Sequence, residues 1–122
     1  MTDLELIWET FDFLTINIAE LEAQHLNNVD TTSIFFATNK SPTREQKDRL
    51  RNKLNKCLDG LLVLYAKQIK CIDELIILNN SDLDIPEERG IDSETLIALK
   101  NVTFTLLEQM KLARVEYESF FI

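Results

Sequence analysis

Between Cys57 and Leu78 the chain carries apolar residues at helical spacing over an unusually wide arc. One line, here called the first stripe, is formed by Leu54, Cys57, Leu61, Leu64, Gln68, Cys71, Leu75 and Leu78. A second stripe beside it is formed by Leu58, Leu62, Tyr65, Ile69, Ile72 and Ile76. A helix that covers a single core needs only one such stripe. We therefore expect this helix to lie centrally between other helices, or to keep part of its surface for another protein.

Two further segments have apolar residues every three or four positions, which predicts amphipathic helices over about 3–27 and 93–120. The first of these seams consists of Leu4, Ile7, Phe11, Leu14, Ile18 and Leu21. The other consists of Leu96, Leu99, Thr103, Leu106, Met110, Ala113, Tyr117 and Phe120, and it is broadened by Val102, Leu107 and Leu112. Thr2 and Glu5 have the form of a capping box, Asn27-Asn28 weakens the first helix, and Asp92 or Ser93 caps the last one.

The central helix is expected over about 42–78. Ser41 is a good cap and Pro42 suits the first helical position, while Thr43 and Gln46 offer an alternative capping box. Gly60 is the only breaker before residue 79, and because this helix would exceed the usual length, a bend at Asp59-Gly60 is allowed for. The heptad-like seams and the absence of strand signals predict one all-α domain over 1–122. Its architecture is an antiparallel three-helix bundle with a long central helix and coiled-coil-like packing, or four helices if a short extra one forms.

The expected loop at 28–41 contains the apolar run Ile34-Phe35-Phe36-Ala37. One interpretation is a short helical turn that plugs the end of the bundle. The other is an exposed docking segment, because exposed aromatic clusters mark interaction surfaces.

Charge is segregated along the 122-residue chain. Residues 1–39 contain no Lys or Arg, whereas 40–56 are strongly basic. In an antiparallel hairpin Glu20 and Glu22 would face that basic segment; alternatively, Arg44, Lys47 and Arg51 form a basic face for an acidic partner. The net charge of −8 argues against nucleic acid and against anionic membrane surfaces as ligands. There is also no apolar run long enough to insert into a membrane.

Neither the single histidine nor the acidic and sulfur-containing residues form a recognisable site. His25 continues the first seam without a nucleophile or co-ligand suggested beside it. A calcium loop starting at Asp82 would need Gly and Glu where Glu87 and Ser93 stand, so the acidic run Asp82, Asp84, Glu87 and Glu88 is interpreted as a solvated loop. We expect no catalytic residues, no metal and no cofactor, and hence a protein that is not an enzyme.

Cys57 and Cys71 are separated by about 21 Å on one continuous helix, which is too far for a disulfide. Together with the lack of a basic N-terminal flank, this favours buried free thiols in an intracellular, reducing compartment, cytoplasmic or nuclear. Ser41-Pro42-Thr43-Arg44 has the form of a proline-directed phosphorylation site, and a phosphate on Ser41 would lie near a helix N-terminus.

These patterns predict a protein–protein interaction module, a small helical subunit or adaptor of a multiprotein assembly. An acidic helical chaperone or regulator that shields an amphipathic segment of a client protein is the alternative, and self-association through the apolar helix surface is a third interpretation. The residues expected to contact a protein partner are Leu62, Ile69, Ile76, Phe35, Phe36, Phe120 and Phe121.

Overall fold

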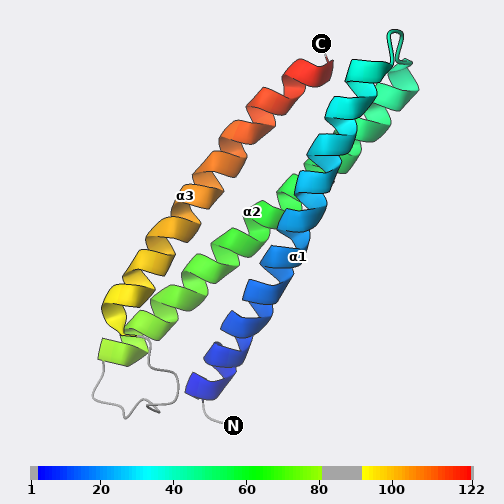
Figure 1. Cartoon of the computed structure of the whole chain (residues 1–122). Coiled ribbons are helices and arrows are strands. Elements are labelled where there is room, and N and C mark those ends of the chain that lie inside the picture. Colours follow the sequence, from blue (N-terminus) through cyan, green and yellow to red (C-terminus); the bar gives the residue numbers. More distant parts are fainter. Residues whose placement is uncertain (1–2, 81–91, 122) are drawn as a thin grey trace.

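The computed structural model describes residues 3–80 and 92–121, with the backbone alone at 79 and 80. The described chain forms α1 (Asp3–Thr38), α2 (Arg44–Asn80), α3 (Ser93–Tyr117) and a short 3-10 helix, η2 (Glu118–Phe121). Figure 1 shows α2 between the other two helices and antiparallel to both. The predicted all-α bundle with three helices and a long central helix is confirmed.

α1 continues through most of the segment where a loop was expected, so the predicted end near residue 27 is wrong. Asn28 and Thr32 are both buried, and the Thr32 hydroxyl donates a hydrogen bond of 2.7 Å to the carbonyl oxygen of Asn28. The weak helix propensity of asparagine amounts to less than about 1 kcal/mol per residue. Burial of this face of the helix outweighs that penalty, and α1 ends only at Thr38.

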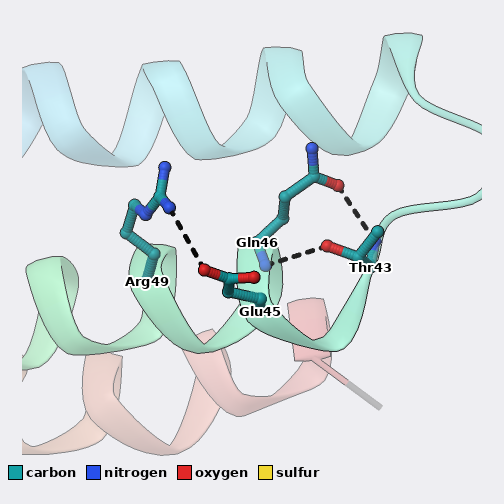
Figure 2. Close-up of polar contacts among 4 residues, drawn as sticks. All are labelled: Thr43, Glu45, Gln46 and Arg49. Carbon is teal, nitrogen blue, oxygen red and sulfur yellow. Dashed lines mark hydrogen bonds and ion pairs between the residues drawn. The ribbon is translucent and has the colours of Figure 1, made fainter.

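A capping box on Thr43 starts α2 (Figure 2). The Thr43 hydroxyl accepts a hydrogen bond of 3.1 Å from the backbone N–H of Gln46, and the Gln46 side-chain oxygen accepts one of 2.9 Å from the Thr43 N–H. Of the two predicted caps, the Thr43 box is therefore confirmed and the Ser41 cap is wrong. Ser41 lies two residues before Thr43, and its backbone N–H donates a hydrogen bond to the side-chain oxygen of Asn39. Figure 2 also shows Arg49 and Glu45 one turn apart, as an exposed ion pair.

Gly60 lies within α2, which is one continuous helix through this position. A Cβ atom at Gly60 would lie 2.8 Å from Cδ2 of Leu21 on α1. This is closer than carbon atoms approach without displacement, so a side chain at position 60 would have to displace the end of the Leu21 side chain.

Asp92 is the N-cap of α3, so of the two predicted caps, Asp92 and Ser93, the first is confirmed. Its carboxylate accepts a hydrogen bond of 2.8 Å from the backbone N–H of Thr95, and the hydrogen bonds from Thr95 hold the pKa of Asp92 below its usual value. Thr2, the predicted cap of the first helix, lies outside the described residues.

The first stripe of α2 lies towards α1 and the second towards α3, although Tyr65 of the second stripe also hydrogen-bonds to Glu22 of α1. On the first stripe, the thiols of Cys57 and Cys71 donate to backbone carbonyls of α1, at Sγ–O distances of 3.6 and 3.5 Å. Beside the second stripe, Asp59 and Asp73 form ion pairs with α3. The wide apolar arc of α2 is thus explained by its central position, with α1 on one side and α3 on the other.

Buried apolar residues occur along α2 from Leu54 to Leu75. The most deeply buried large side chains include Leu54, Leu58, Leu61, Tyr65, Ile72 and Leu75 from α2 and Leu96 from α3. At the end of the bundle nearest the N-terminus, Trp8 joins Ile72, Leu75 and Leu96 in one apolar cluster that unites all three helices.

Candidate protein-interaction surfaces

Leu62, Ile69 and Ile76, the predicted contact residues on α2, are half-buried. They lie on the second stripe, the side of α2 that packs against α3, and Ile76 contacts the apolar cluster around Leu96. Part of each side chain is therefore used for packing within the chain. Whether the remaining surface contacts a partner stays a prediction.

The other predicted contact residues, which come from distant parts of the sequence, meet at one end of the bundle. The Phe36 ring stacks on Phe120 at 6.1 Å between ring centroids and lies edge-on to Phe121 at 5.6 Å, with Phe35 beside it at 5.4 Å. Phe121 is buried and the other three rings are half-buried. This aromatic cluster ties the end of α1 to η2, and a role in binding a partner stays a prediction for it as well.

The three basic residues that we expected to share a face do gather around one hollow. Arg44, Lys47 and Arg51 line a depression of about 380 Å³ together with Asp48 and Phe121. Arg51 is engaged within the chain: it pairs with Asp48 and Glu118, and its guanidinium carbon lies 4.9 Å from the centre of the Phe121 ring. This arrangement leaves both sequence interpretations open, a solvated face and a site for an acidic partner.

Of the two glutamates that we expected to face the basic segment, Glu22 is used differently. Its carboxylate accepts a hydrogen bond of 2.7 Å from the Tyr65 hydroxyl. Burial, followed by this hydrogen bond and the glutamate charge, raises the pKa of Tyr65. The contact is a structural link between α1 and α2.

His25 is buried between α1 and α3, where its Nε2 lies 2.7 Å from the Tyr117 hydroxyl. Burial lowers the pKa of His25 and raises that of Tyr117. The other ring nitrogen, Nδ1, is buried without a hydrogen-bond partner. An imidazole joined to one phenol links α1 to α3, and within residues 3–80 and 92–121 no carboxylate hydrogen-bonds to Nδ1 to orient it as in a catalytic triad.

The two cysteines are free and buried, as their place on the first stripe predicted. Burial raises the pKa of the Cys57 thiol, and burial followed by the Glu74 charge raises that of Cys71 to about 11. At neutral pH both side chains are thiols, which are far weaker nucleophiles than thiolates.

Within residues 3–80 and 92–121, no group of three or more His, Cys, Asp or Glu side chains is placed to hold a metal ion. The acidic run Asp82, Asp84, Glu87 and Glu88 lies outside the described residues. Ser41 is exposed, and its phosphorylation stays a prediction. None of the described helices is long and apolar enough to cross a bilayer.

The structure also exposes large apolar side chains that were not among the predicted contact residues. On α3 these are Ile97, Leu99, Val102, Phe104, Leu112 and Val115, and on α1 they are Leu6, Phe13, Ile16, Leu26 and Ile34. Among the described residues, exposed large apolar side chains are about as numerous as buried ones. Most of them are apolar residues outside the two predicted seams, but Leu99 belongs to the seam of the last helix, and Val102 and Leu112 were expected to broaden it.

Comparison of the chain with protein families, with curated proteins and with solved structures found no significant match.

Proposed function

We propose that the protein is a non-enzymatic interaction module, a small helical subunit or adaptor of a multiprotein assembly, and that α3 supplies its main binding surface. The observation that supports this proposal is that α3 exposes many more apolar side chains than it buries. Of the side chains on this helix only Leu96 is fully buried, while six large apolar ones are exposed.

Four of the exposed residues share one side of α3 and are here called the α3 outer stripe: Ile97, Phe104, Leu112 and Val115. Leu112 and Val115 are 65% and 72% exposed. Single exposed apolar residues are normal on a protein surface, but a line of them along one helix is typical of a surface that another protein covers. A helix that is apolar on several sides is usually buried in a larger structure.

The test is affinity purification of the tagged chain from its native cells, with quantitative mass spectrometry of the proteins that copurify. Phe104→Ser combined with Leu112→Ser should reduce recovery of at least one partner by about tenfold or more, because anchors of this size dominate helix-mediated binding. Both residues are exposed, so the variant should keep the helical circular dichroism spectrum of the wild type.

Val63→Ser combined with Ile77→Ser is the matched control. It removes two equally exposed apolar residues from α2 instead of α3. If both variants keep every partner, or if the wild-type chain is a monomer with no copurifying protein, the proposed function is wrong.

A further inference from the structure

A second line of side chains runs along the face of α1 that is turned away from the core. It consists of Leu6, Glu9, Phe13, Ile16 and Glu20, which alternate steps of three and four residues, and it is here called the α1 outer seam. Leu6, Phe13 and Ile16 are 53%, 67% and 59% exposed, and both glutamates are exposed as well. The spacing is that of a helix seam in a coiled coil, with carboxylates at two of the five positions.

The charge around this seam has one sign along the whole of α1. Residues 1–39 contain no Lys or Arg, so every ionised side chain on the helix is a carboxylate. Apolar anchors set among carboxylates favour a basic amphipathic helix, since complementary charges fix its register and opposed like charges reject an acidic one.

A second copy of this chain is a poor occupant of the same seam. Parallel pairing of two α1 helices would place Glu9 opposite Glu9 and Glu20 opposite Glu20. Antiparallel pairing centred on Phe13 would place Glu20 opposite Leu6 and Glu9 opposite Ile16. Either arrangement holds carboxylates close together or covers them with apolar side chains, and both are costly.

A hollow beside Phe13 offers room for an apolar anchor of the partner. It measures about 380 Å³ and is lined by Ile7, Phe13 and Leu14 from α1 and by Lys67 and Lys70 from α2, among others. Lys67, Lys70 and Glu74 border the α2 side of this hollow, so that side carries charges of both signs. Basic residues of a bound helix are attracted more strongly to α1, whose charged side chains are all carboxylates.

We propose that the α1 outer seam binds a basic amphipathic helix of a partner protein. Apolar side chains of that helix pack on Leu6, Phe13 and Ile16, and its Lys or Arg side chains pair with Glu9 and Glu20. This inference rests on the proposed function as an interaction module, but it concerns a different helix from the α3 outer stripe.

Two synthetic helices of about four heptads test the proposal. One has a leucine seam interrupted by two lysines at the separation of Glu9 and Glu20, and the other has two glutamates at the same places. In calorimetric titrations of the full chain, the lysine peptide should bind at least about tenfold more tightly than the glutamate peptide. Glu9→Lys combined with Glu20→Lys should reverse that preference.

Phe13→Ser combined with Ile16→Ser should weaken binding of the lysine peptide by about tenfold or more. Phe104→Ser combined with Leu112→Ser, on α3, is the control and should leave that affinity unchanged. Equal binding of the two peptides, no binding of either, or a preference that the charge reversal does not invert would overturn the proposal. So would a dimer in sedimentation that the Phe13 and Ile16 substitutions abolish, because a second copy would then be the occupant.

The affinity purification separates this inference from the proposed function. If the α3 variant loses a cellular partner and the charge reversal on α1 loses none, the protein is an interaction module but the α1 seam is not a binding site. If neither variant loses a partner, both proposals are wrong.

Discussion

The two interfaces of α2 are built in different ways. Towards α1 the described contacts are mostly uncharged and close: two thiols donate to backbone carbonyls, Gln68 donates to Thr15 at 3.3 Å, and Gly60 lets Leu21 approach. Towards α3 and η2 the rim carries ion pairs, which join Arg51 to Glu118, Asp59 to Arg114 and Asp73 to Lys100.

From this difference we expect α3 to be held more weakly than α1. Exposed ion pairs contribute only about 0–1 kcal/mol each and are screened by salt, whereas apolar burial at close distance is not. Because α3 adds a single fully buried residue to the core, we expect it to be the least stable helix of the free chain. A helix of this kind gains most when a partner covers its exposed apolar side.

Among the substitutions considered, Leu96→Ala should cause the largest loss of stability. Leu96 packs against Trp8, Ile72 and Leu75, and truncation of a buried leucine costs about 2–5 kcal/mol. We expect α3 to detach, seen as a partial loss of helical circular dichroism and a lower free energy of unfolding in urea. Leu112→Ala on the exposed side should change that energy by less than about 0.5 kcal/mol. Equal effects of the two substitutions would show that Leu96 is not the anchor of α3.

Gly60→Val tests the close approach on the α1 side. The new side chain meets Leu21, and overpacking of this kind costs about 1–3 kcal/mol in urea titrations. In a Leu21→Ala background the same substitution should cost less, because the obstructing methyl group is gone. The loss should not change with sodium chloride concentration. A loss that is unaffected by removal of the Leu21 side chain would contradict the contact.

The sign of the pH dependence follows from His25, which links α1 to α3. Burial lowers the pKa of His25 in the folded chain, so the unfolded chain takes up a proton first as the pH falls through about 6.5. The contribution of His25 to stability should therefore be complete well above this pH and should decline as the pH falls from about 7.5 to 5.5, by no more than about 1.4 kcal/mol per pH unit. His25→Gln should flatten the profile of unfolding free energy in this range. An unchanged slope in that variant would assign the pH dependence to other groups.

Asp59→Asn combined with Asp73→Asn should have the smallest effect, about 0–1 kcal/mol for each pair removed. Its signature is the loss of salt dependence: added sodium chloride should loosen α3 in the wild type and not in the variant, as measured by hydrogen exchange. Glu45→Gln breaks an ion pair inside α2 and serves as the control. If it abolishes the salt dependence equally well, the pairs to α3 are not its source.

Much of the fold follows from local patterns in the sequence. The seams that begin at Leu4 and Leu96 correspond to α1 and α3, and the two stripes together correspond to α2. Thr43 caps α2 and Asp92 caps α3, as the sequence predicted. The end of α1 was missed because Asn27-Asn28 has weak helix propensity. The burial that extends this helix to Thr38 depends on contacts with distant residues, such as that between Phe36 and Phe120.

The candidate surfaces were harder to predict for a related reason. Periodicity identifies the line of apolar residues on a helix that best suits a core. It does not show which other helix, if any, covers a second apolar line on the same helix. Leu62 and Ile69 on the second stripe were expected to contact a partner, yet α3 packs along this stripe. Most of the exposed residues lie outside the best seams, such as Phe13 on α1 and Phe104 on α3. Only the packing of the three helices shows which apolar side chains remain uncovered.

Whether α3 is the weakly held helix can be measured by hydrogen exchange of the free wild-type chain, followed by mass spectrometry at low and high salt. Amides of α3 should exchange faster than those in the middle of α1 and α2, and added salt should widen the difference in exchange rate. Exchange of all three helices at one common rate, unaffected by salt, would show a single cooperative unit and would contradict the account of α3 as the weakly held helix with an uncovered binding surface.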